Sequence, residues 1–350
     1  MLKNKKILIT GGAGFLGMHL ANFFEKQDAQ ITLIDIAPFP EHEYSSKTIK
    51  INADIRNRKA MEKYLHGQDF VVHAAAALPL WKKEDIFSTN TDGTRNILEA
   101  ARKNKVKRVV YISSTAVYGV PKKHPIVETD PLVGVGPYGI TKIEAEKLCF
   151  EAIKKGQNVT IIRPKTFLGT GRLGVFEILF DWIHDGKRIP VIGSGNNRYQ
   201  LLDVDDLVAA IAKVIEIDSK ILNDSYNIGA HSFGTVRSDL ESVFKVSRAG
   251  STLMPTLAWP IKKALYVFEK LGLSPLYQWV YDTADRDSFV SIDKLTSALN
   301  WKPKYSNSDA LIKAYKWYLK NYSEIKARKS GVTHTVGWKQ GVLGLVKKFM

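Results

Sequence analysis

Residues 5–17 read KKILITGGAGFLG, and this stretch decides the fold of the chain. The aliphatic residues 7–9 predict a short buried strand that stops at a glycine cluster, and the apolar residues after Gly14 recur at helical spacing. Glycine lets a ligand approach the backbone closely, and a helix N-terminus presents bare N–H groups to an anion. The stretch therefore predicts a strand, a tight turn and a helix that bind the pyrophosphate of a dinucleotide.

A second strand over residues 30–34 leads to Asp35, eighteen residues past Gly17. An acid at this spacing accepts hydrogen bonds from the adenosine ribose hydroxyls. Its carboxylate would repel a 2′-phosphate, so NAD is favoured over NADP. Glycine-rich turns are common by themselves, and the acid at this distance is what favours a cofactor site.

Composition indicates a globular protein with room for one large domain and a lobe, since the 350 residues are 45% hydrophobic and 25% charged. The only cysteine, Cys149, excludes an internal disulfide and favours a reducing compartment, so we expect a cytoplasmic protein with a passive core thiol. The first strand begins within a few residues of Met1 and no apolar run of about 18 residues occurs. We therefore expect neither a signal peptide nor a spanning helix.

The formal net charge of +16 needs an explanation. Lysines and arginines are spread over the whole chain and no nucleic-acid-binding motif accompanies them, so no nucleic acid partner is expected. An anionic small-molecule substrate or an anionic membrane surface fits the charge better. No metal site is predicted.

A third strand over residues 48–51 is followed by Asp54 and Ile55. An acid and an aliphatic side chain at the carboxyl end of a strand suit the edge and face of an adenine. The alternative is that Asp54 caps a helix that begins near Arg56.

A fourth strand over residues 70–72 runs into a stretch of alanines that includes Ala74 and Ala75. Small side chains leave the backbone open to a flat ligand that lies across the strand ends, although an alanine-rich helix start would have the same sequence. A helix that contains Asn90 follows, and then a strand over residues 108–112.

Tyr138 and Lys142 lie four residues apart in a helical pattern, so their side chains share one side of the helix. A nearby ammonium lowers the pKa of a phenol toward a range useful for proton transfer. Ser114 follows the strand at 108–112, where the ligand crevice of a parallel sheet is expected. The three residues together predict acid–base chemistry on a hydroxyl or carbonyl group.

With these motifs in place, the chain resembles the extended short-chain dehydrogenase/reductase family from residue 7 to about residue 318. This family contains NAD-dependent sugar-nucleotide epimerases and dehydratases and the 3β-hydroxysteroid dehydrogenase-like enzymes. The matching segments are TGGAGFLG at 10–17, Asp35, Asp54-Ile55, His73-Ala74-Ala75, Asn90 with Gly93-Thr94, SSTAVYG at 113–119, Tyr138 with Lys142, Arg163-Pro164, DVDDL at 203–207, NIG at 227–229 and LNWKP at 299–303.

The resemblance implies a role for each matching residue. Tyr138 is the expected catalytic base and acid, Lys142 holds the nicotinamide ribose and biases that tyrosine, and Ser114 hydrogen-bonds the reacting oxygen. Asn90 braces the site from its helix. The residues expected to bind NAD are Gly11, Gly14, Phe15, Leu16, Gly17, Asp35, Asp54, Ile55, Ala74, Ala75, Asn90, Lys142 and Pro164.

The implied fold class is α/β, a Rossmann-type doubly wound parallel sheet with a smaller, mostly C-terminal substrate lobe. We assign residues 1–164 to the NAD-binding domain, to which 203–229 return, residues 165–202 and 230–320 to the lobe, and 321–350 to a basic amphipathic tail. We expect a strand at 225–228 and helices at 203–216, 90–103 and 138–154. Family members commonly form homodimers through the latter two helices.

The sequence departs from the epimerase pattern where substrate would bind. Thr166 stands where an asparagine usually binds the pyrophosphate. A basic phosphate ligand is expected at the position of Tyr199, and Arg198 lies one position before it. Thr115-Ala116 replaces the Asp-Glu pair of dehydratases, so 4,6-dehydratase chemistry is not expected. The candidate substrate residues are Ser114, Thr115, Thr166, Arg172, Arg198 and Arg286, with Lys165 as a further possible cation. Ordinary solvated surface charge is the alternative for each basic residue.

Two apolar segments stand outside these motifs. Residues 253–281 are rich in large apolar groups, which fits a packed lobe helix or else a lipid-facing or substrate-gating flap. The tail at 321–350 carries six basic residues against one acid, Glu324, and a helix over 338–350 would place Trp338, Val342, Leu345, Val346 and Phe349 on one face. That helix would rest on an anionic bilayer or pack back onto the body.

The sequence thus predicts an enzyme that oxidises a secondary hydroxyl by hydride transfer to NAD+. The expected outcome is epimerisation of a nucleotide sugar. An alternative is 3β-hydroxysteroid dehydrogenase-like oxidation of a hydrophobic or lipid-linked alcohol, and a second is a non-catalytic NAD-binding scaffold. Peripheral membrane contact through the tail is a further expectation.

Overall fold

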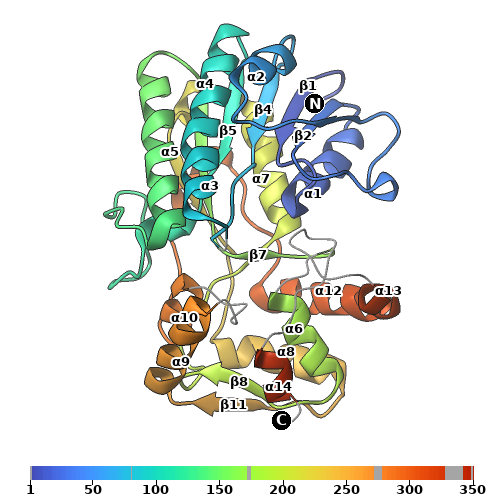
Figure 1. Ribbon diagram of the computed structural model, residues 1–350, viewed down its shortest axis with the longest axis vertical. Coiled ribbons are helices and arrows are strands. Elements are labelled where there is room, and N and C mark those ends of the chain that lie inside the picture. Colours follow the sequence, from blue (N-terminus) through green and yellow to red (C-terminus); the bar gives the residue numbers. More distant parts are fainter. Residues whose placement is uncertain (1, 80, 172–174, 272–277, 328–341, 348–349) are drawn as a thin grey trace.

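The computed structural model describes residues 2–79, 81–171, 175–271, 278–327, 342–347 and 350. Its upper half in Figure 1 is built on a seven-stranded sheet with the order β10-β6-β5-β4-β1-β2-β3, in which every neighbouring pair is parallel. The strands are β1 (Lys6–Thr10), β2 (Gln30–Asp35), β3 (Ile49–Asn52), β4 (Phe70–His73), β5 (Arg108–Ile112), β6 (Val159–Pro164) and β10 (Ser225–Ile228). This order confirms the doubly wound fold and puts the switch point between β1 and β4.

Helices cover both faces of the sheet, because its strands are aliphatic on both sides. One face packs on α1 (Phe15–Glu25) and α7 (Val204–Ile217), and the other packs on α2 (Arg58–Tyr64), α4 (Thr94–Lys103) and α5 (Gly136–Lys154). The expected strand at 225–228 is confirmed, and Asp203 caps the helix expected at 203–216 by accepting from the amide of Asp205 at 2.8 Å. Buried Cys149 lies in the second core, as the sequence predicts.

Short elements complete this half. They are η1 (Glu41–Glu43), α3 (Lys83–Phe87), the π-helix η2 (Ser88–Gly93), the 3-10 helices η3 (Thr115–Tyr118) and η4 (Lys220–Leu222), and α11 (Asp293–Leu299). Leu295 and Leu299 of α11 belong to the same core as α1 and α7. This part of the segment that we assign to the lobe therefore packs with the NAD-binding half.

The lobe fills the lower half of Figure 1 and has its own apolar core. Two short parallel pairs join strands that are distant in sequence, β7 (Phe167–Leu168) with β9 (Leu202–Asp203) and β8 (Ile189–Ile192) with β11 (Leu253–Thr256). Its helices are α6 (Val175–His184), α8 (Val236–Ser247), α9 (Ala258–Lys270), α10 (Gln278–Thr283), α12 (Asn307–Lys320), α13 (Tyr322–Ala327) and α14 (Val342–Lys347). Among the described residues, no helix is both long and apolar enough to span a membrane.

The described part of the tail packs back onto the lobe. Val346 and Met350 lie against the lobe core, and Lys347 Nζ forms ion pairs with Asp181 at 2.5 Å and Asp185 at 2.7 Å. Of the two alternatives for the tail, packing on the body therefore holds for these residues. Trp338 and Phe349 lie outside the described residues.

Helix α9 corrects the prediction of a fully packed lobe helix over 253–281. None of its residues is buried, and Trp259 is 73% exposed. The physical reason is that apolar residues lie nearly all round this segment, so the sequence does not select which face, if any, enters the core.

Candidate active site

The glycine turn after β1 is too tight for side chains at Gly11, Gly12 and Gly17. Gly11 has φ +72°, and a Cβ there would lie 2.8 Å from the amide nitrogen of Ala75. A Cβ on Gly17 would lie 2.3 Å from the carbonyl oxygen of Gly11. No side chain caps α1 at Gly14, so the turn presents backbone to whatever binds at this helix end. This cradle fits a pyrophosphate.

Asp35 ends β2 and fixes the glycine turn. Its Oδ2 accepts from the amide of Ala13 at 3.0 Å, and its Oδ1 accepts from the amide of Ala37 at 2.9 Å. Each oxygen has a second lone pair, so the carboxylate can also accept from a ribose hydroxyl. These contacts fit the predicted role of Asp35 toward NAD.

The helix-cap alternative for Asp54 is wrong, because Asn57 caps α2 by accepting from the amide of Ala60 at 3.1 Å. Asp54 instead accepts from the backbone and the guanidinium of Arg56, both at 2.8 Å. Burial opposes ionisation of Asp54, but the bonds from Arg56 bring its pKa below the ordinary value. Ile55 is buried, and a Cβ on Gly93 would lie 2.5 Å from its Cδ1.

Buried His73 ties β1 to β4 at the switch point. Its Nε2 lies 3.0 Å from Thr94 Oγ1, which itself donates to a carbonyl, and its Nδ1 lies 2.7 Å from Thr10 Oγ1. Burial and the charge of Lys142 lower the pKa of His73 to about 3, so the ring is neutral. Thr10 Oγ1 also accepts from the amide of Ala75 at 3.2 Å.

The alanine stretch that follows β4 is an extended loop, so the helix-start alternative for it is wrong. Asn90 holds this loop from the π-helix η2. Its Oδ1 accepts from the amide of Ala77 at 2.8 Å, and its Nδ2 donates to Thr141 Oγ1 of α5 at 3.1 Å. These bonds fit the predicted bracing role, since they join the open backbone at Ala74 and Ala75 to the helix that carries Tyr138.

Ser114 follows the end of β5, and Lys142 of α5 reaches the same strand end with Tyr138 one helical turn before it. Lys142 Nζ donates to the carbonyl of Ile112 at 2.8 Å and lies 5.8 Å from the centre of the Tyr138 ring. Ser114 Oγ accepts from the amide of Ala116 at 3.1 Å, which leaves its hydrogen available to donate. Burial lowers the pKa of Lys142 to about 8, against the opposing charge of Glu146.

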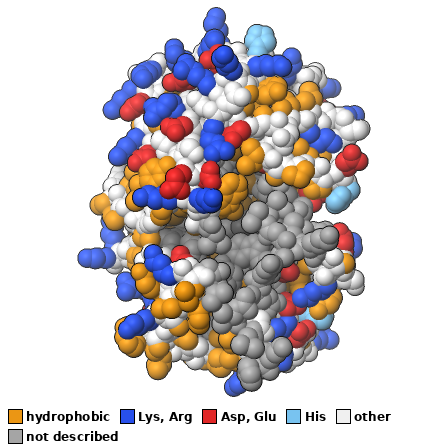
Figure 2. Space-filling model, viewed as in Figure 1, with side chains coloured by type: hydrophobic (Ala, Val, Ile, Leu, Met, Phe, Trp, Pro, Cys, Tyr) orange, Lys and Arg blue, Asp and Glu red, His pale blue; other side chains and the backbone are white. Residues whose placement is uncertain are grey.

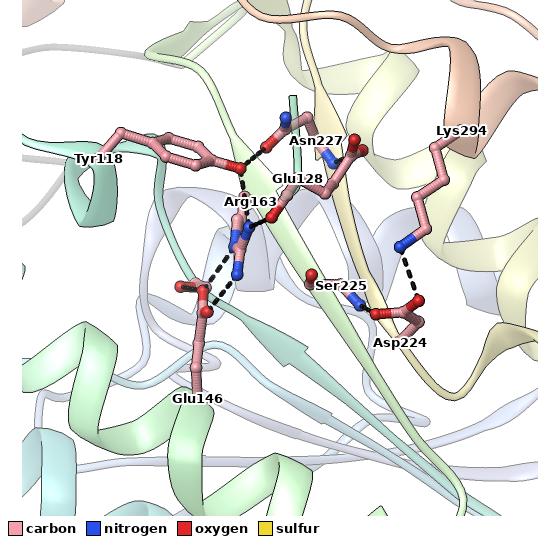
Figure 3. Close-up of polar contacts among 9 residues, drawn as sticks. Tyr118, Glu128, Glu146, Arg163, Asp224, Ser225, Asn227 and Lys294 are labelled. Atoms are coloured by element: carbon pink, nitrogen blue, oxygen red, sulfur yellow. Dashed lines mark hydrogen bonds and ion pairs between the residues drawn. The ribbon is translucent and has the colours of Figure 1, made fainter. Parts of the chain in front are cut away.

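A buried polar network stands behind this helix (Figure 3). Arg163 of β6 donates to both carboxylate oxygens of Glu146, at 2.9 and 2.6 Å, and to Tyr118 at 2.7 Å. Ser113 Oγ donates to Glu146 at 2.6 Å, and Tyr118 donates to Asn227 at 2.8 Å. The network locks α5 to three strands and thereby fixes Tyr138 and Lys142. Our reading of the sequence missed Glu146, although it lies four residues past Lys142 on the same helix face.

The candidate substrate residues are more scattered. Thr115 Oγ1 donates to the carbonyl of Pro164 at 3.3 Å, and Thr166 accepts through its carbonyl from the amide of Leu202 at 3.0 Å. The guanidinium of Arg198 lies 4.7 Å from the centres of two phenylalanine rings. The side chain of Arg286 is exposed, and Arg172 lies outside the described residues. No cluster of three potential metal ligands occurs among the residues that the structure describes.

The model of the NAD dependent epimerase/dehydratase family matches residues 7–229. The chain is 36% identical to the uncharacterized protein y4nG of Sinorhizobium fredii over 98% of this chain and 85% of that protein. It is 31% identical to N-acetyl-alpha-D-glucosaminyl-diphospho-ditrans,octacis-undecaprenol 4-epimerase of Escherichia coli O157:H7, over 59% of this chain and 62% of the relative.

A solved structure shows the same architecture. It is UDP-glucuronic acid 4-epimerase from Bacillus cereus in complex with UDP-glucuronic acid and NAD, with a TM-score of 0.73, 25% identity and coverage of 91% of this chain and 100% of that one. The family model matches residues 7–229, and this range contains the glycine turn and the other motifs described above. The chain belongs to the NAD dependent epimerase/dehydratase family and is an NAD-dependent enzyme of the extended short-chain dehydrogenase/reductase type.

Proposed function

We propose that the protein epimerises a secondary hydroxyl of a sugar that carries a diphosphate, with a nucleotide sugar as the first candidate substrate. The observation that carries this proposal is that Lys142 reaches the carboxyl end of β5, which Ser114 follows, and lies 5.8 Å from the centre of the Tyr138 ring. This place adjoins the crevice beside the switch point of the sheet, where ligands of doubly wound folds bind.

Each of the three residues has a separate task in this reaction. NAD, when bound, accepts a hydride from the carbon that bears the hydroxyl. Tyr138 takes the hydroxyl proton, and the ammonium of Lys142 favours the phenolate that does so. Ser114 donates its hydrogen to the reacting oxygen and holds it in line. Tyr138 would return the proton as the hydride held by the cofactor is given back to the opposite face of the carbonyl, which would give the epimer.

Several observations support this choice of reaction and substrate. The two epimerases reported above carry a sugar diphosphate in their names. In one the diphosphate is joined to a nucleoside, and in the other it is joined to a polyprenol. Thr115-Ala116 offers no carboxylate to remove a ring proton, which argues against a 4,6-dehydratase. The family of the chain and the intact catalytic group set the non-catalytic scaffold aside, and a hydroxysteroid substrate has no support beyond the apolar lobe.

The test is product analysis with NAD-loaded protein and a panel of UDP-hexoses, UDP-N-acetylhexosamines and UDP-hexuronic acids. We expect one pair of 4-epimers to interconvert. Tyr138→Phe should lower kcat about 100-fold or more, because it removes the proton-transfer group, and should bind NAD as tightly as the native protein. Full turnover by Tyr138→Phe would contradict the mechanism. A panel without any turnover would contradict the nucleotide sugar.

A second candidate substrate is a sugar diphosphate on a lipid, and the outer face of α9 favours it. Trp259, Tyr266 and Val267 are 73%, 47% and 48% exposed, and exposed Lys263 and Lys270 lie among them. The acid of the helix, Glu269, faces inward and accepts from Tyr281 at 2.5 Å. Figure 2 shows hydrophobic and basic side chains gathered at the lower left, where α9 lies. Aromatic residues mixed with lysines are typical of a helix that lies on an anionic bilayer.

The two substrates are distinguished by offering each at the same concentration. A sugar-diphospho-polyprenol in anionic vesicles should be epimerised faster than the matching UDP-sugar if the lipid is recognised. Equal or slower turnover would favour the nucleotide sugar.

Association of two copies through α4 and α5 is a separate prediction, which sedimentation analysis of the purified protein checks.

A further inference from the structure

Lys165 follows β6 directly and is the buried cation that the catalytic group does not use. Its side chain is 1% exposed, and its Nζ donates to Ser288 Oγ at 2.7 Å and lies 4.9 Å from the centre of the Tyr199 ring. No carboxylate of the described residues lies within 4.0 Å of this ammonium. Its charge therefore has no counter-ion in the part of the chain that the structure describes.

The buried arginines of the described residues are compensated by acids, whereas buried Lys142 donates to the carbonyl of Ile112. Arg163 meets Glu146 at 2.6 Å, and Arg108 meets Asp218 at 3.1 Å. A buried ammonium without such a partner is costly, so the protein shifts its protonation instead. Burial lowers the pKa of Lys165 to about 7. A lysine with such a lowered pKa is partly neutral at pH 7 to 8, so it takes up a proton when an anion binds beside it.

The surroundings of Lys165 connect the sheet with the lobe. The preceding residue, Pro164, accepts from Thr115, the neighbour of Ser114. Ser288 pairs with the lobe segment 198–200, since its amide donates to the carbonyl of Arg198 at 2.8 Å and its carbonyl accepts from the amide of Gln200 at 3.0 Å. Lys165 thus lies at the end of β6, one strand from the catalytic group on β5.

A second basic group without a partner lies near it. His124 Nε2 is buried and has no hydrogen-bond partner among the described residues, and its ring centre lies 4.9 Å from that of Phe289, the residue after Ser288. Burial and the charge of Lys165 lower the pKa of His124, against the attraction of Asp287. A ligand with one or more acceptor oxygens would give both the Lys165 ammonium and the His124 ring a hydrogen-bond partner.

We propose that Lys165, together with Ser288, binds an anionic oxygen of the substrate, either a carboxylate on its sugar or its diphosphate. The identity of the substrate rests on the proposed function, but the anion site does not. Our sequence interpretation gave Lys165 as one of four cations that could meet an anion, with ordinary surface charge as the alternative for each. Its burial and its bond to Ser288, 123 residues away, distinguish it from Arg198 and Arg286.

The experiment is calorimetric titration of NAD-loaded native protein, Lys165→Met and Ser288→Ala with UDP, UDP-glucose and UDP-glucuronate. Loss of about tenfold or more in affinity for UDP-glucuronate alone, or for all three probes, supports the proposal. The first result assigns the carboxylate and the second the diphosphate. Lys245→Met, which removes an exposed lysine, is the control and should bind as the native protein does.

A readout of protonation separates binding from a structural role. At pH 8, titrations in two buffers of different ionisation enthalpy should show proton uptake by the native protein and none by Lys165→Met. Unchanged affinity and unchanged proton uptake in Lys165→Met would overturn the proposal. If the native protein binds none of these nucleotides, the nucleotide-sugar function fails. Inorganic diphosphate and glucuronate then test the anion site, and no binding of either would overturn it.

Discussion

Helices α4 and α9 belong to the two halves of the molecule and differ in what they bury. Helix α4 buries Ile97 and Leu98 and three smaller residues against the sheet, whereas α9 buries none. The same contrast holds for cations, since Arg163 of the sheet has an acid partner and Lys165 at the lobe has none. Arg163 in the NAD-binding half is thus satisfied within the protein, whereas the lobe keeps an exposed apolar helix face and a buried ammonium that a ligand or a surface can satisfy.

The largest expected effect is on stability, in a comparison of Arg163→Met with Lys165→Met. Removing Arg163 leaves the buried carboxylate of Glu146 uncompensated, which should cost about 3–5 kcal/mol. Removing Lys165 removes a buried charge without orphaning an acid, so the free energy of unfolding should stay level or rise. Urea denaturation of both variants measures this. Equal losses would mean that the two cations play the same structural part.

The sequence was sufficient for the NAD-binding half because its signals are local. A strand, a glycine turn and a helix follow one another within residues 6–25, and Asp35 ends the next strand. Tyr138 and Lys142 share a helix, so their proximity follows from the helical repeat. The parallel order of the strands then places Ser114 nearby.

The remaining contacts depend on packing between distant segments. The bond from Asn90 to Thr141 joins residues 51 positions apart, and that from Lys165 to Ser288 joins residues 123 apart. No periodicity encodes such pairs. The sequence also did not predict which face of α9 packs on the core, because apolar residues lie nearly all round this helix.

The next effect concerns the glycine turn. Gly11→Ala places a Cβ 2.8 Å from the backbone amide nitrogen of Ala75, which cannot move aside, so we expect a loss of about 1–3 kcal/mol and much weaker NAD binding. Gly67→Ala is the matched control, because Gly67 has the same φ of +72° but its Cβ would meet nothing within 4 Å. Thermal unfolding with and without NAD should separate the two, and equal behaviour would contradict the tight-cradle interpretation.

A smaller effect is the pH dependence that Lys165 introduces. Its pKa is about 7 in the folded protein against 10.5 for an ordinary lysine, so between these values the unfolded chain binds more protons. Stability should therefore rise with pH from 7 to 10.5 through this group, and the cost of the buried charge is fully present below pH 7. The difference in unfolding free energy between Lys165→Met and the native protein should shrink over that range. A constant difference would mean that Lys165 stays charged.

The smallest effect on folding is expected at α9, where the combined Trp259→Ser and Leu271→Ser should change stability by less than about 0.5 kcal/mol per site because both side chains are exposed. Binding to vesicles should nevertheless fall strongly, since these side chains would enter the bilayer interface. Lys263→Glu with Lys270→Glu should abolish only the preference for anionic over neutral vesicles. Ile221→Ser, at a 72% exposed position outside the lobe helix, is the control and should leave vesicle binding unchanged. Native protein that ignores anionic vesicles, or that dimerises through α9 instead, would show that the outer face of this helix serves another copy of the chain or no partner at all.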